Sequence, residues 1–324
     1  MQAIKIQDDK LIWASHPDPG PLKADEVRIR IAWAGMNRAD LMQRAGSYPP
    51  PSGASEVMGL EVSGWVEAVG ADVSRFAVGD EVCALLAGGG YAEQVVVSEL
   101  QVLPVPQGLG LREAAALPEV FATAWLNLYM EARLQPGERV LLHAGASGVG
   151  TAALQLCRMS GNPCFVTAGS ADKVEFCKSL GADAGWNRHD GSFVEAVKTW
   201  GGADVILDPV GGDYIPQDQA VLNLEGRLVL LGLMGGRHAE VDLGRLLFKR
   251  QRLIGSTLRS KSSQEKGAIL GELHRQVWPH LSSGKIRALI DSEWPIQEAD
   301  AAMQHLRSNQ TIGKVLLQVA EAGR

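Results

Sequence analysis

A glycine-rich hexapeptide, Gly145-Ala146-Ser147-Gly148-Val149-Gly150, is the most chemically informative segment of this 324-residue chain. It follows an apolar segment, residues 139–143, that predicts a strand, and it opens a segment, residues 148–160, that predicts a helix. In such a turn glycines let the backbone approach a pyrophosphate, and the helix N-terminus offers amides and a positive dipole end. The turn therefore predicts a dinucleotide site, the alternative being a tight turn without a ligand. Ser147, in the middle glycine position, is expected to bond a phosphate or to cap the helix.

The residues after the next predicted strand indicate which dinucleotide binds. NAD-binding domains place an acidic residue about 20 residues after the turn, where it binds the ribose 2′-hydroxyl. Here residues 166–170 read Val-Thr-Ala-Gly-Ser, without an acid, and Lys173 and Arg188 follow. Cations attract a 2′-phosphate that a carboxylate would repel. We therefore expect NADPH, the alternative being that both cations are ordinary surface charges.

The elements around the turn are predicted from hydrophobic patterning. Strand-like and helix-like segments alternate from about residue 139 to residue 231, which is typical of a doubly wound parallel sheet. The first 110 or so residues are instead rich in short apolar segments separated by glycine and proline, which favours a small β-barrel. Residues 313–319 predict a last strand, which we expect to return to this first domain.

Composition excludes several classes of partner. The chain is 46% hydrophobic with a net charge of −6, which argues against a nucleic-acid or anionic-membrane surface. The four cysteines show no CxxC spacing, so we expect neither a disulfide framework nor a clustered zinc site. Residues 1–6 read as a strand rather than a leader peptide, and no apolar run reaches the roughly 18 residues of a membrane span. We expect a cytoplasmic protein.

Several stretches, in order along the chain, resemble the medium-chain dehydrogenase/reductase superfamily. Within it the chain is most similar to the zinc-free quinone oxidoreductases of the zeta-crystallin type, and among these to the tumour-suppressor-inducible quinone oxidoreductase group. The stretches are residues 34–40, 44–50, 59–64, 78–82, 143–156, 167–170, 231–236 and 312–315. The resemblance implies an α/β chain of two domains. A GroES-like β-barrel catalytic domain would span residues 1–119 and be completed by residues 286–324, and a Rossmann NADPH-binding domain with a doubly wound parallel sheet would span residues 120–285.

The resemblance also implies that no metal is bound. Zinc members of the superfamily carry Cys, His and Cys where this chain has Met36-Asn37, Leu60 and Leu117-Pro118. Zinc needs three or four nitrogen, sulfur or oxygen ligands, and Glu61 alone does not hold it. We expect Glu61 to have a structural, hydrogen-bonding role.

The activity implied is zinc-independent reduction of a quinone, by hydride or single-electron transfer in a cleft between the domains. Such a site aligns the acceptor with the nicotinamide and supplies a donor for the developing oxyanion. Tyr48 and Asn37 are the candidate donors, and the resemblance places Arg259 nearby. Each has an alternative: Tyr48 packs on the prolines that follow it, Asn37 ties down its own turn, and Arg259 pairs with a surface carboxylate.

The resemblance maps the cofactor contacts onto residues in both halves of the chain. Ser147, Gly148 and Val149 would meet the pyrophosphate, and Gly169, Ser170, Lys173 and Arg188 the 2′-phosphate. The nicotinamide end would be met by Thr123, Val210, Leu231, Leu233 and Met234, with Phe248, Ser256 and Leu258 close by and Asn309 closing the cleft. His143, although it precedes the turn, is expected to pack or hydrogen-bond beneath it rather than to take part in catalysis.

Two other functions remain open from the sequence. One is NADPH-dependent reduction of an α,β-unsaturated carbonyl or enoyl thioester, and the other is a non-catalytic NADPH-binding redox sensor or crystallin-like protein. The partner expected is a small conjugated electrophile. The resemblance also implies a homodimer, because this family commonly pairs edge strands of its dinucleotide sheet across a two-fold axis, and residues 253–258 would be an exposed edge of that kind.

Overall fold

The computed structural model describes residues 1–320 of the chain, which divide into two compact units. Residues 1–122 and the chain from Leu258 onward form the first unit, and residues 123–257 form the second. The resemblance implies that residues 258–285 belong to the dinucleotide domain, whereas the structure has them in the first unit. These residues lie in the first unit because helix α9 (Ser263–Gln276) packs on the 3-10 helix η1 (Glu99–Gln101). The Trp278 indole also donates to the Pro104 carbonyl, at 2.8 Å.

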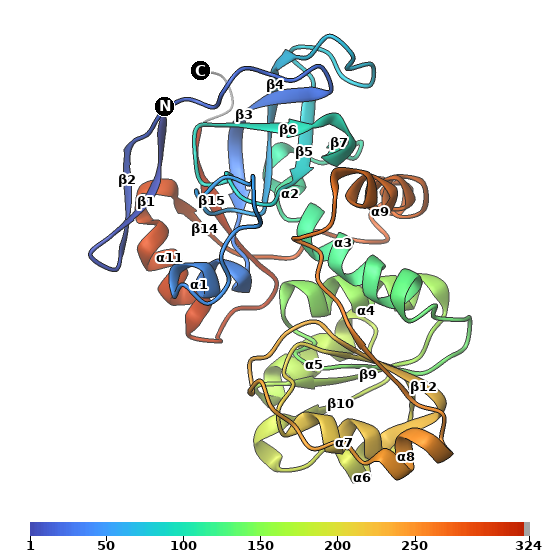
Figure 1. The fold of residues 1–324 in the computed structure, drawn as a ribbon. Helices are drawn as coiled ribbons and strands as arrows, with labels where there is room; N and C mark the ends of the chain where they lie inside the picture. Colours follow the sequence, from blue (N-terminus) through green and yellow to red (C-terminus); the bar gives the residue numbers. More distant parts are fainter. Residues whose placement is uncertain (321–324) are drawn as a thin grey trace. The chain divides into compact units, whose positions relative to one another are not determined.

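The first unit is built on a seven-stranded sheet (Figure 1). Alternate residues of its central strand, Val27, Ile29 and Ile31, are fully buried, as the polar–apolar alternation of this segment predicts. The last strand pairs antiparallel with this central strand, which confirms that the chain returns to the first unit. The sheet order is β14 (Ile290–Pro295), β15 (Lys314–Gln318), β3 (Glu26–Gly35), β4 (Glu61–Val69), β5 (Glu81–Leu85) and β7 (Val102–Pro104), with β6 (Gln94–Ser98) also pairing β3 and a hairpin of β1 (Gln2–Gln7) and β2 (Lys10–Ser15) beside it.

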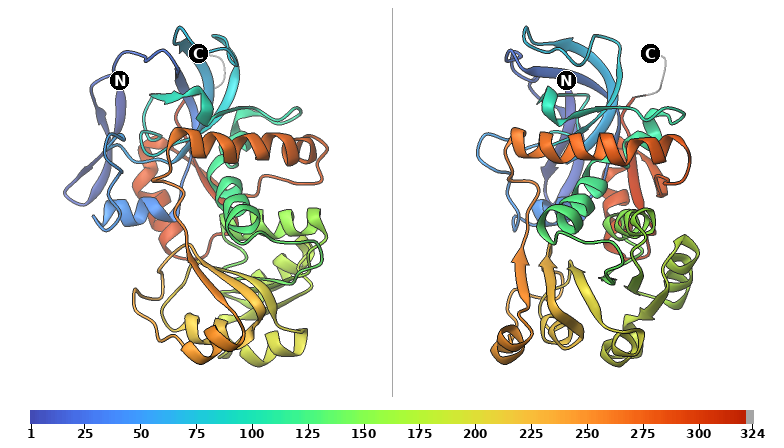
Figure 2. Two further views of the ribbon diagram at one scale, coloured as in Figure 1. Left: turned by 45° about the vertical axis from the view of Figure 1, so that its right-hand side comes forward. Right: turned by 90° about the vertical axis from the view of Figure 1, so that its right-hand side faces the viewer.

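Short helices cover this sheet. In both views of Figure 2 the long helix α9 lies beside the strands of the first unit, as its contacts with β7 and η1 require. The others are α1 (Arg38–Arg44), α2 (Leu111–Ala114), the first half of α3 (Pro118–Trp125), α10 (Trp278–Ser282), α11 (Ala299–Arg307) and the 3-10 helix η4 (Ile296–Glu298).

The second unit is a six-stranded sheet in which every pairing is parallel. Its order is β10 (Ala184–Asn187), β9 (Cys164–Ala168), β8 (Val140–Leu142), β11 (Ala203–Asp208), β12 (Leu222–Leu230) and β13 (Arg252–Gly255). Helices α4 (Gly148–Ser160) and α5 (Ala171–Leu180) pair on one side of the sheet in Figure 1, and α6 (Val194–Trp200), α7 (Tyr214–Val221) and α8 (Leu243–Phe248) lie on the other. A π-helical segment η2 (Leu126–Glu131) and a 3-10 turn η3 (Arg188–Asp190) complete the unit. The α/β class with a doubly wound parallel sheet is therefore confirmed.

Strands β8 and β9 are buried along their whole length, as expected for central strands covered on both faces. Among residues 1–320, no helix combines the length and the apolar character that crossing a membrane requires.

Candidate active site

The glycine-rich turn joins β8 to α4 in the second unit, as predicted. Ser147 is the N-cap of α4, and its Oγ accepts the Gly150 amide at 3.1 Å. A Cβ at Gly145 would lie 2.7 Å from Val166 Cβ on β9, and one at Gly150 would lie 2.4 Å from the Ala144 carbonyl oxygen. Both glycines are therefore required by packing. The first amides of a helix have no partner within it, so this turn fits a pyrophosphate.

The end of β9 carries the groups expected at a 2′-phosphate. Ser170 is the N-cap of α5 and accepts the Lys173 amide at 3.3 Å. Arg188 follows β10, which pairs in parallel with β9. Its guanidinium lies against Gly169: a Cβ placed on Gly169 would be 3.7 Å from Arg188 Nε. Asp172 is exposed in the first turn of α5, where a carboxylate is favoured. The Arg188 guanidinium thus lies at the small-residue end of β9, where no acid stands among residues 166–170, and this arrangement fits a phosphate.

Four residues assigned to the nicotinamide end lie together after β11 and β12. Val210 accepts the Gly235 amide at 2.7 Å, and the Met234 amide donates to the Pro209 carbonyl at 3.3 Å. A Cβ at Gly211 would meet Leu233 Cδ2 at 3.2 Å, and the Leu231 amide donates to the Asp208 carbonyl at 2.9 Å. Leu233 and Met234 are among the exposed apolar residues of the chain. The carboxyl ends of parallel strands are where doubly wound sheets bind ligands.

Ser256 adds a polar group to this end of the sheet. Its amide donates to the Leu230 carbonyl at 3.0 Å, next to Leu231. Its Oγ is buried and has no hydrogen-bond partner within residues 1–320. A buried hydroxyl without a partner is costly, and a carboxamide bound beside Leu231 would satisfy it.

Phe248 lies away from these residues in the second unit, and its contact with a cofactor stays a prediction. It ends α8 and is 80% exposed. The next residue, Lys249, bonds the Glu225 amide and the Leu222 carbonyl, near the amino end of β12. Phe248 therefore lies near the amino ends of the parallel strands, whereas the phosphate turn lies at their carboxyl ends.

Thr123, Leu258 and Asn309 lie at or beyond the boundary between the units. Thr123 is the first residue of the second unit, and its carbonyl accepts Asn127 Nδ2 at 2.7 Å. Leu258 begins the returning segment of the first unit and is buried there. In the same unit, Asn309 Oδ1 accepts from the Arg38 guanidinium at 2.5 Å. Their proposed contacts with a cofactor stay predictions.

His143 has the structural role expected of it. It is buried, and its two ring nitrogens lie 2.8 Å from Thr167 Oγ1 and 2.8 Å from Asp218 Oδ1. Both nitrogens are thus engaged inside the second unit, and the rings of Phe193 and Tyr214 pack against it.

Asn37 belongs to a buried polar network in the first unit. Its Nδ2 donates to Glu61 Oε1 at 3.0 Å, and its Oδ1 accepts from Lys314 Nζ at 2.7 Å. Its amide donates to Asp40 Oδ2 at 2.7 Å. A Cβ at Gly35 would lie 2.5 Å from Glu61 Oε1, so only glycine leaves room for this carboxylate. Both polar atoms of the Asn37 side chain are therefore engaged within the protein, and a contact of Asn37 with a substrate stays a prediction.

Glu61 is fully buried, and both of its oxygens are engaged. Oε1 pairs with Lys314 Nζ at 2.6 Å, and Oε2 accepts the Glu119 amide at 2.9 Å. The structural role expected of Glu61 agrees with these contacts. Lys314, on the last strand, was missed in the sequence because its partners lie more than 250 residues away.

Tyr48 and Arg259 lie together in the same unit. Arg259 is 3% exposed, and it donates from Nε to the Ala87 carbonyl at 2.8 Å and from its terminal nitrogens to the Tyr48 carbonyl at 3.1 Å and to Gln43 Oε1 at 2.7 Å. Its guanidinium carbon lies 5.2 Å from the centre of the Tyr48 ring. The surface ion pair considered for Arg259 is not found. This arginine instead holds the loop that carries Tyr48.

Of Tyr48 and Arg259, only Tyr48 has a side-chain donor that makes no hydrogen bond within residues 1–320. The side chain is half-buried, and its hydroxyl makes no hydrogen bond within the described residues 1–320. Burial raises the pKa of Tyr48 above its usual value of 10.0, and the nearby charge of Glu119 raises it further. The phenol therefore keeps its proton at neutral pH.

A zinc ion does not fit the residues at the expected metal position. The Leu60 side chain is buried, and the Asn37 amide and both Glu61 oxygens bond other protein groups. Among residues 1–320, no group of three or more His, Cys, Asp or Glu side chains is arranged to hold a metal.

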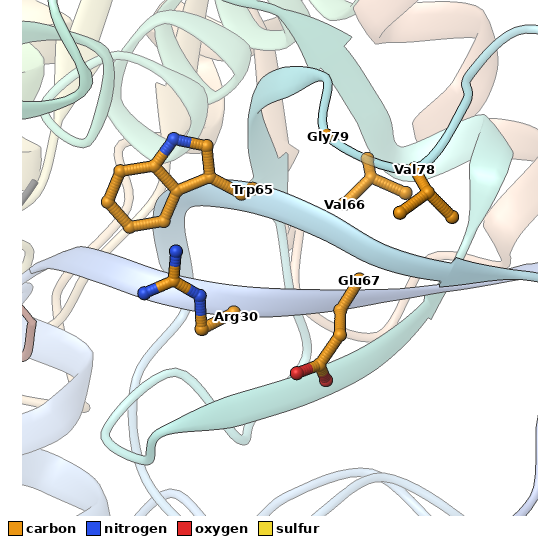
Figure 3. A pocket seen from close by; sticks show the side chains of 6 residues that line it. All are labelled: Arg30, Trp65, Val66, Glu67, Val78 and Gly79. Carbon is orange, nitrogen blue, oxygen red and sulfur yellow. The ribbon is translucent and has the colours of Figure 1, made fainter. Parts of the chain in front are cut away.

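A separate hollow of about 270 Å³ lies on the barrel of the first unit (Figure 3). The Arg30 guanidinium stacks 4.2 Å from the Trp65 ring at its wall. Arg30 lies five residues before Gly35 along β3, about 16 Å at 3.3 Å per residue. The hollow contains none of the predicted donors.

Comparisons with known proteins match both halves of the chain. The family model "Alcohol dehydrogenase GroES-like domain" matches residues 23–107, and "Zinc-binding dehydrogenase" matches residues 148–272. The synaptic vesicle membrane protein VAT-1 homolog of Rattus norvegicus is 33% identical over 317 residues, covering 93% of this chain and 78% of the relative. Quinone oxidoreductase-like protein 2 of Bos taurus is 32% identical over 303 residues, covering 92% and 86%.

Solved structures are similar over almost the whole chain. The quinone oxidoreductase of Escherichia coli complexed with NADPH is 27% identical with a TM-score of 0.85, covering 98% of this chain and 99% of that one. CurK enoyl reductase is 32% identical with a TM-score of 0.85, with the same coverage.

Proposed function

Because the chain belongs to the medium-chain dehydrogenase/reductase superfamily and is thereby an oxidoreductase, we propose that it reduces quinones with NADPH and without a metal ion. The similarity to a quinone oxidoreductase-like protein and to a quinone oxidoreductase that binds NADPH supports this proposal. The more specific tumour-suppressor-inducible group stays a resemblance.

The observation that carries the proposal is the free hydroxyl of Tyr48, whose ring faces the buried guanidinium of Arg259. Hydride addition to a quinone oxygen or ring carbon leaves an anion, and a preorganised donor stabilises that charge as it forms. Arg259 fixes the Tyr48 backbone and places a buried positive charge 5.2 Å from the ring. We give Asn37 a positioning role, because its side-chain nitrogen already donates to Glu61 and its side-chain oxygen already accepts from Lys314.

The metal-free part of the proposal rests on the Glu61–Lys314 pair. Lys314 Nζ lies 2.6 Å from Glu61 Oε1 in a fully buried setting, so the carboxylate already has its counter-charge. A quinone is electrophilic enough to accept a hydride without a Lewis acid, whereas an alcohol substrate would need one.

When bound, NADPH supplies the hydride. The turn at Ser147 would hold its pyrophosphate, and Arg188 and Lys173 its 2′-phosphate. Val210, Leu231, Leu233 and Met234 would pack on the nicotinamide and exclude water, and Ser256 Oγ would bond its carboxamide.

A second candidate is the reduction of an enone or enoyl thioester. The similarity to CurK enoyl reductase, at 32% identity, favours it specifically. The same donor would serve, since addition to the β-carbon leaves an enolate in place of a quinol anion.

Steady-state rates with both nicotinamides separate these functions. We expect NADPH oxidation with 1,2-naphthoquinone at a kcat/KM well above that with an enoyl thioester, and slower turnover with NADH. A higher kcat/KM with the thioester would assign the second function instead. Tight NADPH binding without oxidation across the panel would indicate a non-catalytic sensor.

The second unit also supports a homodimer. Strand β13 is the edge of its sheet, and α8 beside it exposes Leu243, Leu247 and Phe248 at 71–80%. Pairing of two β13 edges would cover unpaired backbone groups and this apolar surface together.

A further inference from the structure

Gln43 is a nearly buried amide beside Arg259 to which the hydride-transfer proposal gives no role. It lies in the last turn of α1 and is 9% exposed. Its Oε1 accepts from a terminal nitrogen of Arg259 at 2.7 Å, and its Nε2 donates to the Glu56 carbonyl at 3.0 Å. One side chain therefore joins α1 to the loop before β4 and to an arginine 216 positions further along the chain.

The turn after α1 joins Gln43 to Tyr48 through the backbone. The Gly46 amide donates to the Gln43 carbonyl, and the next amide donates to the carbonyl one residue further back, both at 2.9 Å. These bonds form a Schellman motif, in which Gly46 takes the left-handed conformation with a φ of +70°. Arg259 bonds both ends of this segment, the Gln43 side chain and the Tyr48 carbonyl. The Tyr48 loop is thus tied to Gln43 both directly and through Arg259.

The groups that the Arg259 side chain bonds within residues 1–320 are all neutral. They are the Ala87 carbonyl at 2.8 Å, the Tyr48 carbonyl at 3.1 Å and Gln43 Oε1 at 2.7 Å. A guanidinium keeps its charge in proteins, and this one is on a residue that is 3% exposed. These dipoles hold the buried charge without cancelling it, 5.2 Å from the centre of the Tyr48 ring.

Another partly buried arginine of the chain has a carboxylate partner instead. In the second unit, the terminal nitrogens of Arg227 bond both oxygens of Glu138, at 2.8 and 2.6 Å. Such a pair leaves little net charge to act on a third group. Asp40 and Glu119 act on Arg259 through space, but its side-chain nitrogens bond neither of them. At Gln43, Arg259 therefore meets an amide where a carboxylate of the same shape would cancel its charge.

We propose that Gln43 is a positioning residue for the reduction: it holds Arg259 with a neutral acceptor, so that this cation both fixes Tyr48 and stabilises the anion formed on the substrate. This inference rests on the proposed function.

The charges of the reactants indicate which rate constant Gln43 should affect. A quinone and the Tyr48 phenol are neutral before hydride transfer, so the field of Arg259 has little effect on substrate binding. The anion that forms carries a full charge, which a nearby cation in a buried site stabilises. Cancelling the charge of Arg259 should therefore lower kcat and leave KM almost unchanged.

Steady-state kinetics of Gln43→Glu test the charge. We expect a kcat for 1,2-naphthoquinone roughly 10- to 100-fold lower with little change in KM, because a carboxylate at this position would cancel the field of Arg259. Gln43→Met loses the same bonds to Arg259 and Glu56 without adding a charge, so its kcat should fall less.

Gln135→Glu is the matched control for the added charge. This exposed amide also donates to a backbone carbonyl, that of Arg133 at 2.7 Å, and the change should leave kcat unaffected. No loss of kcat in Gln43→Glu, or equal losses in Gln43→Glu and Gln43→Met, would overturn the inference.

The ionisation of Tyr48 tests the same charge without cofactor or substrate. Burial raises the pKa of Tyr48, and the charge of Arg259 lowers it. In ultraviolet difference titration, the ionisation step that Tyr48→Phe removes should move to higher pH in Gln43→Glu, but not in Gln43→Met. An unmoved step in Gln43→Glu would overturn the inference. A moved step in a protein that reduces no quinone would overturn the proposed function and still support the control of the Arg259 charge by Gln43.

A second pair of variants serves if Gln43→Glu does not fold. Gln43→Asp and Gln43→Asn have side chains of the same shape and differ in charge. The lower kcat and the higher-pH step are expected in Gln43→Asp relative to Gln43→Asn, and equal behaviour of the two would overturn the inference.

Discussion

At the scale of single residues, Tyr48 combines a free hydroxyl with a backbone fixed by a buried guanidinium. We expect Tyr48→Phe to lower kcat/KM for 1,2-naphthoquinone roughly 10- to 100-fold, because the developing oxyanion loses its donor. The melting temperature should barely change, since the hydroxyl has no bond to lose within residues 1–320. Tyr129→Phe is the matched control, since its hydroxyl bonds Leu156 and Ser160. It should lower the melting temperature and leave kcat/KM unchanged. The reverse pattern would remove Tyr48 from the mechanism.

Arg188 tests the preference for NADPH. Arg188→Ala should weaken NADPH binding roughly 10- to 100-fold, the loss expected for one charge-assisted hydrogen bond, and should leave NADH binding unchanged. Fluorescence titration with both cofactors measures this. Arg250→Ala removes an exposed arginine paired with Glu225 in the same unit, and it should change neither affinity. Equal affinities of the wild-type protein for NADH and NADPH would contradict the role given to Arg188.

The site could be predicted from the sequence where function depends on a local pattern. The turn at Ser147, and the small-residue end of β9 with its nearby arginine, were identified from spacing alone and lie as expected. Lys314 was not, because its significance depends on contacts with Glu61 and Asn37, which lie more than 250 positions away in the sequence. The sequence also does not indicate at which end of the parallel strands Phe248 lies, because an apolar residue just before a strand carries no such signal.

At the scale of elements, the β8–α4 turn depends on the absence of a Cβ at Gly145. Gly145→Ala would place a methyl group 2.7 Å from Val166 Cβ, so α4 must shift away from β9. We expect a loss of roughly 1–3 kcal/mol in the free energy of unfolding and weaker NADPH binding. Gly271→Ala, in α9, is the control. Nothing lies within 4 Å of its Cβ position, so it should stabilise the protein slightly. Denaturant unfolding of both variants checks this, and an unaffected Gly145→Ala would contradict the packing argument.

The exposed edge of the second unit tests the homodimer. Leu247→Glu puts a charge on a side chain that is 71% exposed, so the monomer fold should tolerate it while a dimer using this face should not form. Sedimentation at micromolar concentration should show a dimer for the wild type and a monomer for this variant. Val78→Glu, on a 66% exposed residue of the first unit, should leave the dimer intact. A monomeric wild-type protein would exclude the dimer.

At the scale of the whole molecule, alternating patterns predicted both the barrel and the parallel sheet. The return of the last strand to the first unit was also predicted. The position of α9 was not, because an amphipathic helix after the last parallel strand carries no local sign of the unit it packs against. Its contact with η1 and the Trp278–Pro104 bond decide that position, and both join residues more than 160 apart.

The central claim is metal-free hydride transfer from NADPH to a quinone. A single-turnover measurement with NADPH deuterated at C4, on protein treated with a chelator, tests it most directly. The account predicts that 1,2-naphthoquinone oxidises the bound cofactor, that deuterium slows this step, and that chelation has no effect. Loss of the reaction on chelation, or no cofactor oxidation at all, would contradict the account.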